Sequence, residues 1–201
     1  MDYTVLLKCY LIIMQTQKEI NREMKKFLSN KDFDKYLTGA SDKVVKYSDL
    51  DQFKSVYDLL PDYEDYRIIL IEQRLNSGHW VNIARRGNNF CFLDSYGYGP
   101  IQNLNFVSKK MNQFLGQERQ DFSGLFKGLK NDSYTLIHNK KKYQKNSPNI
   151  NTCGRHVLVF IGKFIQGYSL KEYQKWMQEQ NRNSGYSYDE IVTLLTRFPK
   201  A

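Results

Sequence analysis

Three residues whose side chains can cooperate in nucleophilic catalysis occur along this sequence in the order His79, Asp94 and Cys153. A thiol becomes a strong nucleophile when a nearby imidazole takes its proton, and a carboxylate can fix the tautomer of that imidazole and stabilise its charge. Each residue alone is commonplace, as a surface histidine, a turn aspartate or a buried cysteine. Together they predict thiol-based hydrolysis.

The surroundings of Cys153 suit a nucleophile. An apolar stretch, residues 155–165, follows the cysteine, and we expect it to form a buried central helix. A cysteine at the N-terminus of a helix lies at the positive end of the helix dipole, which favours the thiolate. The backbone N–H of Cys153 can bind an oxyanion, and Gly154 lets the backbone approach a substrate closely.

The elements that must position these residues follow from hydrophobic periodicity. We expect strands near residues 66–72, 80–85, 89–94 and 134–138. We expect helices near residues 4–28, 49–60 and 106–115, after Cys153, and after Ser169 and Ser187, where Ser-x-x-Glu matches a capping box. Residues 32–46 read as an irregular connection. The prediction is an α+β fold with a central, mainly antiparallel sheet flanked by helices.

Composition limits the class of protein. The chain has 201 residues, of which 41% are hydrophobic, so we expect one globular domain over 1–201 with a catalytic core near 66–166. Three cysteines without regular spacing imply no disulfide framework and a reducing compartment. Cys9 and Cys91 fall in apolar runs and are predicted to be inert. The apolar run at residues 3–14 is too short to span a membrane and lacks the features of a signal peptide.

The chain is strongly basic, with a net charge of +9 and a pI near 9.3. Four lysines, Lys140, Lys141, Lys142 and Lys145, cluster in the polar loop before Cys153. Such a cluster is compatible with contact to DNA or with a solvated loop that aids solubility, and the sequence leaves both interpretations open. No spacing of His and Cys residues matches a complete metal site.

Three stretches together resemble a known group of enzymes: Gly78-His79-Trp80, residues 92–97 and residues 151–157. They are similar to the adenain and SUMO-protease-like clan of cysteine proteases, which includes the adenovirus maturation protease, the SUMO- and ubiquitin-like-protein proteases, and the capsid-maturation proteases of large DNA viruses and virophages. The resemblance covers about residues 66–166. It implies that His79 is the base, Asp94 its orienting acid and Cys153 the nucleophile.

The resemblance also implies the remaining parts of the site. An oxyanion-hole amide precedes the cysteine in this clan, and Gln144 is the first choice for it, although Asn146 and Asn149 are nearer to Cys153. Trp80 would line a narrow channel that selects small residues, as in Gly-Gly sequences. The expected substrate is a viral capsid or other structural precursor, cleaved in the virion, the host cytoplasm or a viral factory by a monomer that requires no cofactor; a DNA or peptide activator is left open.

Two alternatives remain at this point. A ubiquitin- or SUMO-like-protein protease of the same clan would carry the same residues and would differ only in its substrate. A basic nucleic-acid-binding module, in which the three residues coincide by chance, would explain the charge without catalysis.

Overall fold

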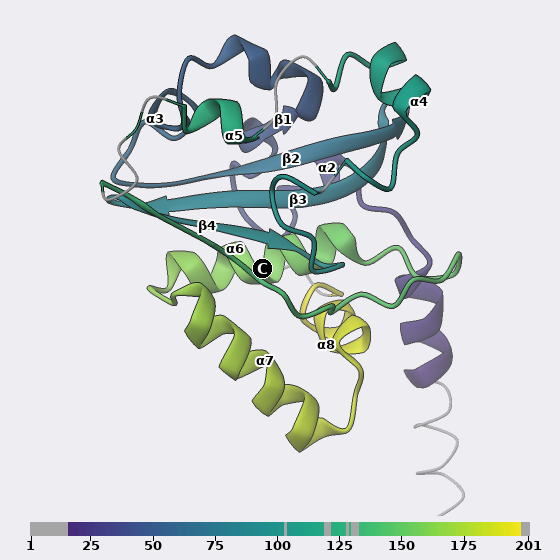
Figure 1. The fold of residues 1–201 in the computed structure, drawn as a ribbon. Coiled ribbons are helices and arrows are strands. Elements are labelled where there is room, and N and C mark those ends of the chain that lie inside the picture. Colours follow the sequence, from purple (N-terminus) through teal and green to yellow (C-terminus); the bar gives the residue numbers. More distant parts are fainter. Residues whose placement is uncertain (1–15, 103, 119–121, 128, 130–132, 198–201) are drawn as a thin grey trace, which may run out of the picture.

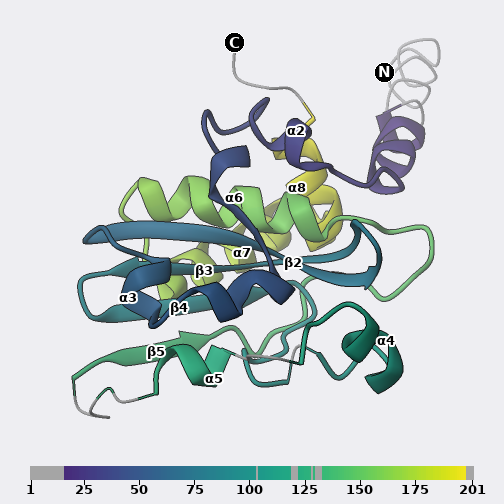
Figure 2. The same ribbon diagram turned by 90° about the horizontal axis from the view of Figure 1, so that it is seen from above.

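The computed structural model describes residues 16–102, 104–118, 122–127, 129 and 133–197, and in it a five-stranded sheet has helices on both faces (Figures 1 and 2). The strands are β1 (Val44–Lys46), β2 (Glu64–Arg74), β3 (Ser77–Arg86), β4 (Asn89–Asp94) and β5 (Thr135–His138). The helices are α2 (Asn30–Phe33), α3 (Val56–Leu59), α4 (Lys109–Phe114), α5 (Phe122–Leu125), α6 (Cys153–Ile165), α7 (Leu170–Ser184) and α8 (Tyr188–Leu195). Two short 3₁₀ helices are η1 (Ser41–Lys43) and η2 (Tyr47–Gln52), and residues 16–24 are also helical.

The predicted α+β architecture is confirmed, and the sheet is mixed, with long antiparallel pairings at its centre and short parallel pairings at its two edges. Its strand order is β1-β2-β3-β4-β5. The central strand β3 is antiparallel to both of its neighbours, β2 and β4, whereas β1 is parallel to β2 and β5 is parallel to β4. A parallel neighbour needs a long crossover connection. The segment with η2 and α3 connects β1 to β2, and the segment with α4 and α5 connects β4 to β5.

Alternation along the central strands divides the apolar side chains between two cores. The first core packs against α6, α7 and α8, and its sheet residues include Ile68, Leu70, Trp80, Ala84, Cys91 and Leu93. The second core packs against η2, α3 and α5, and its sheet residues include Ile69, Ile71, Val81, Ile83, Phe90 and Phe92. Successive side chains point to opposite faces of a strand, so both faces of this sheet are covered. Figure 1 shows the α6–α8 layer on one side and α3 and α5 on the other.

Most helix starts agree with the sequence, and the exceptions have local causes. The capping boxes at Ser169 and Ser187 are confirmed. The helix expected over 49–60 is divided into η2 and α3, because the Ser55 hydroxyl caps a new start by accepting from the Asp58 N–H. The irregular connection expected over 32–46 contains β1. Of the helix expected over 4–28, residues 4–15 and Cys9 lie outside the described residues.

None of the helices in the described part of the chain combines the length and the apolar character that crossing a bilayer requires.

Candidate active site

His79 and Asp94 lie on neighbouring antiparallel strands and contact each other directly. Asp94, the last residue of β4, is paired with Val81 of β3, so His79 lies two residues along β3 from that pair. Such diagonal neighbours on one face of a sheet are within reach of long side chains. The His79 Nε2 atom is 2.8 Å from Asp94 Oδ1, and both side chains are buried.

Asp94 is held through one carboxylate oxygen, Oδ1, and through its backbone. The backbone N–H of Tyr96 donates to Asp94 Oδ1 at 2.7 Å. The Asn139 amide brackets the Asp94 backbone, because its Oδ1 accepts from the Asp94 N–H at 2.9 Å and its Nδ2 donates to the Asp94 carbonyl at 2.6 Å. Asp94 is therefore held in one orientation toward His79.

The His79 ring is enclosed by aromatic side chains. Tyr96 stacks on it with the ring centroids 4.8 Å apart, and Phe106 meets it edge-on at 5.5 Å. With Nε2 bonded to Asp94, Nδ1 is the ring nitrogen left for another partner. The Cys153 side chain is the other polar neighbour of the imidazole and is close enough to raise its pKa.

The charge state of His79 follows from these neighbours. Burial by itself disfavours the imidazolium, yet the charge and hydrogen bond of Asp94, together with the sulfur of Cys153, raise the pKa of His79 to about 10. An opposite charge within hydrogen-bond distance favours the charged form of a group. The imidazolium is therefore the favoured form at neutral pH.

Cys153 is the first residue of α6 and has a free thiol. Its side chain packs with the first core, on the α6 side of the sheet, whereas alternation places His79 on the opposite face with Val81. The two meet because pairing between β3 and β4 stops at Val81 and Asp94, so residues 77–80 of β3 extend beyond β4. The structure thus brings His79, Asp94 and Cys153 together at the end of β4.

Gln144 is buried beside this group, while Asn146 and Asn149 are exposed. Its Oε1 accepts from the Ser95 hydroxyl at 2.8 Å. Its Nε2 donates to the Tyr96 hydroxyl and to the Ile150 carbonyl, both at 3.1 Å. Tyr96 thus connects the Gln144 amide with the His79 ring, because its hydroxyl bonds to the amide and its ring stacks on the imidazole.

Trp80 and Gly154 lie next to each other beneath the chain segment at Leu28. The Trp80 indole N–H donates to the Leu28 carbonyl at 3.0 Å, and a β-carbon on Gly154 would lie 3.2 Å from Trp80 Cδ1 and from Phe33 Cε1. The close approach that Gly154 permits here is to these side chains. Trp80 also lines a cavity of about 200 Å³ with Phe27, Leu28 and Gly78, so its predicted contact with a substrate stays open to test.

The four loop lysines lie on the loop that carries Gln144. Lys140, Lys142 and Lys145 are exposed and Lys141 is half-buried. Lys142 Nζ lies 5.6 Å from the centre of the Tyr96 ring, and Lys141 Nζ lies 4.7 Å from that of Tyr188. The cluster therefore borders the site, and contact with DNA stays a prediction.

Sequence reasoning missed Tyr96 and Asn139. Tyr96 contacts His79, Asp94 and Gln144, and its place two residues after Asp94 in a turn was the available signal. Asn139 lies 45 residues from Asp94 in sequence, so no local pattern relates the two.

Comparison with known proteins gives a viral relative and no family. No protein-family profile matches the chain. The chain is 27% identical over 180 residues to uncharacterized protein V9 of the Sputnik virophage, which spans 89% of this chain and 99% of that protein. The similarity thus extends along nearly the whole of both chains, and it is to a viral protein.

Proposed function

We propose that this protein is a cysteine endopeptidase with Cys153 as its nucleophile. One observation carries the proposal: a continuous contact from Asp94 through the His79 imidazole to a thiol at the start of a buried helix. A thiol, an imidazole and a carboxylate in this order are the parts that nucleophilic hydrolysis of an amide requires.

The acylation step uses the groups in turn. The Cys153 thiolate attacks the scissile carbonyl carbon, a carbon–sulfur bond forms, and the carbonyl oxygen becomes an oxyanion. The His79 imidazolium, which holds the former thiol proton, gives it to the leaving amine as the carbon–nitrogen bond breaks. Water then attacks the thioester with His79 as the base, which releases the acid product and returns the proton to the Cys153–His79 pair.

The oxyanion would be bound by the Cys153 N–H and by the Gln144 amide. Gln144 Nε2 already has two acceptors, the Tyr96 hydroxyl and the Ile150 carbonyl. A substrate oxyanion would take the place of one of them, since a charged acceptor forms the stronger hydrogen bond. Ser95 would keep the amide oriented from its other end.

The proposed substrate is a viral structural precursor protein cleaved after a small residue. The similarity to a virophage protein supports the viral setting. The resemblance of the His79, Asp94 and Cys153 segments to capsid-maturation proteases supports the substrate class and the preference for sequences such as Gly-Gly. Cleavage of a ubiquitin-like conjugate is the alternative within the same chemistry.

The decisive experiment compares the wild-type protein with Cys153→Ala on capsid precursors and on a ubiquitin-like fusion protein, and maps new N-termini by mass spectrometry. We expect cleavage by the wild type, none by Cys153→Ala, and unchanged circular dichroism in the variant. Cys91→Ser is the matched control, because Cys91 is a buried thiol in β4 that contacts the Ala84 carbonyl and not His79. Retained activity in Cys153→Ala would contradict the proposal.

Electrophile labelling separates the proposal from a basic binding module. A thiolate paired with His79 should react with iodoacetamide at neutral pH far faster than Cys91, whose pKa is raised to about 12 by burial. Equal and slow labelling of both cysteines would favour the binding module.

A further inference from the structure

We propose that Asp189, on α8, is a positioning residue that fixes the loop between Gln144 and Cys153. The inference rests on the proposed function, since it assigns to α8 the role of fixing the position of Gln144, the oxyanion donor, relative to Cys153, the nucleophile. Within the described part of the chain, Asp189 forms no hydrogen bond with His79, Asp94 or Cys153, so it would act through the loop.

The Asp189 carboxylate accepts from three different parts of the site's framework. Its Oδ2 accepts from the backbone N–H of Lys145 at 2.9 Å. Its Oδ1 accepts from the Thr152 hydroxyl and lies 3.2 Å from Nε2 of His156, which is on α6. Lys145 directly follows Gln144 and Thr152 directly precedes Cys153, so a single side chain holds both ends of the intervening loop.

The contacts of Asp189 are buried, so they hold the loop firmly in place. Asp189, Thr152 and His156 are each at most 3% exposed. A carboxylate removed from water needs charged or polar partners, and breaking one of these contacts leaves an uncompensated group. Asp189 lies in the first turn of α8, where the helix dipole favours a negative charge. The carboxylate is therefore a stable anchor.

The Gln144 backbone N–H donates to the Ser95 carbonyl at 2.9 Å, whereas the loop that follows it has few attachments to the rest of the protein besides Asp189. Residues 145, 146, 148 and 149 are exposed. Asn151 bonds to the carbonyls of Met24 and Lys25, and the Ile150 carbonyl accepts from Gln144 itself. Without Asp189, the end of the loop next to Gln144 would lose its tie to the helical layer. A displacement of about 1 Å at such a donor can cost about a hundred-fold in turnover.

The test uses Asp189→Asn, which keeps the size of the side chain but replaces one of the two acceptor oxygens with an amide nitrogen. The Lys145 N–H, the Thr152 hydroxyl and His156 Nε2 all meet at this side chain. Thr152→Val removes one donor, and Thr152→Ser, which keeps the hydroxyl, is its matched control. Asp65→Asn controls for the loss of a buried carboxylate, because Asp65 binds Lys43 and Arg67. Asp65 lies six residues along β2 from Ile71, the strand partner of His79, which places it about 20 Å from that end of the strand.

We expect Asp189→Asn to lower kcat for a peptide substrate about a hundred-fold, with KM and the rate of Cys153 alkylation by iodoacetamide within about two-fold of wild type. Alkylation needs no oxyanion donor, and α6 and His79 still hold Cys153 in the variant, so its rate reports on the thiol and not on the Gln144 end of the loop. Thr152→Val should change kcat in the same direction and Thr152→Ser should not. Asp65→Asn should lower thermal stability while leaving kcat unchanged.

The outcomes separate this inference from the proposed function. Hydrogen exchange should be faster over residues 144–152 in Asp189→Asn and unchanged over the rest of α6, whether or not peptide is cleaved. Unchanged exchange and kcat would overturn the positioning role. So would a joint fall of kcat, alkylation rate and melting temperature, which is the signature of general destabilisation. A wild-type protein with an unreactive Cys153 would instead overturn the proposed function.

Discussion

At the scale of single residues, the charge of His79 is set by its neighbours Asp94 and Cys153. The raised pKa of His79, about 10, results from the Asp94 carboxylate and the Cys153 sulfur acting against burial. A pKa raised above its ordinary value of 6.5 means that protonation stabilises the folded state. This contribution is complete below 6.5 and is lost as the pH rises through about 10. In the proposed mechanism, this proton is the one that passes to the leaving amine.

This balance predicts the pH dependence of peptide hydrolysis. The alkaline limb of kcat/KM should lie near pH 10 in the wild type, because the imidazolium persists to that pH. Asp94→Asn removes the largest favourable charge, so its alkaline limb should lie at lower pH and its kcat should be reduced. Circular dichroism at each pH controls for unfolding. An alkaline limb at the same pH in both proteins would show that Asp94 does not set the charge of His79.

A second residue-scale prediction concerns the oxyanion donor. Gln144→Ala should lower kcat about a hundred- to a thousand-fold, the usual cost of one such donor, with little change in KM. Asn146→Ala and Asn149→Ala serve as controls, because both side chains are exposed in the same loop. If Gln144→Ala is silent and one of the asparagine variants is not, the role belongs to that asparagine.

At the scale of elements, the start of α6 must pack tightly against β3 and the segment at Leu28. Gly154→Ala would place a β-carbon 3.2 Å from Phe33 and Trp80 and 3.3 Å from Leu28, so the helix start would have to shift. We expect a loss of about 1–3 kcal/mol in the free energy of unfolding, together with reduced turnover.

Gly162→Ala is the matched control within the same helix. Apart from its chain neighbours and the backbone of α6 itself, no described atom lies within 4 Å of a β-carbon built there, so the variant should be more stable by about 0.5–1 kcal/mol through its higher helix propensity. Thermal unfolding of both variants measures the difference. Similar effects at the two positions would mean that the start of α6 is not tightly packed.

The elements also show how far sequence reasoning extends. Alternation and apolar runs predicted β2, β3, β4 and β5, and Ser-x-x-Glu predicted the starts of α7 and α8. The three-residue strand β1 was missed, because its pairing depends on β2 and not on its own pattern. The contacts of Asn139 and Asp189 could not be predicted for the same reason: each links segments that are tens of residues apart.

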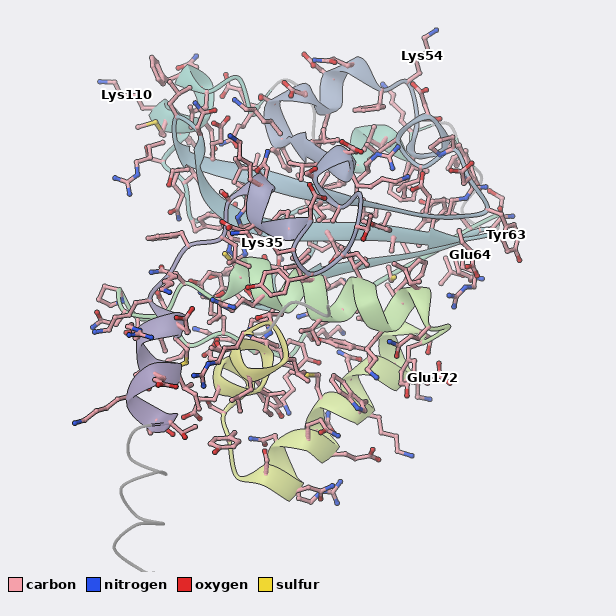
Figure 3. All side chains as sticks on the ribbon, turned by 180° about the vertical axis from the view of Figure 1, so that it is seen from behind. Lys35, Lys54, Tyr63, Glu64, Lys110 and Glu172 are labelled. Atoms are coloured by element: carbon pink, nitrogen blue, oxygen red, sulfur yellow. The ribbon has the colours of Figure 1, made fainter. Side chains whose placement is uncertain are left out.

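At the scale of the whole molecule, the net charge of +9 is distributed over the surface as well as concentrated in the loop before Cys153. Lys35, Lys54 and Lys110 project from different parts of the fold (Figure 3). The loop differs from these positions because Lys142 lies against Tyr96, which stacks on His79, and Lys145 directly follows Gln144 in sequence. A polyanion bound there would hold enzyme and substrate on one polymer.

This distribution predicts weak DNA binding without sequence preference, with an affinity that falls steeply as salt is added. Replacing Lys140, Lys141, Lys142 and Lys145 with Gln should weaken binding and reduce the salt dependence. The control variant replaces four exposed lysines elsewhere, at positions 54, 109, 110 and 171, and lowers the net charge equally. Fluorescence anisotropy at several salt concentrations measures both. Equal losses in the two variants would mean that DNA responds to overall charge, and no binding at low salt would leave the loop lysines as a feature of solubility.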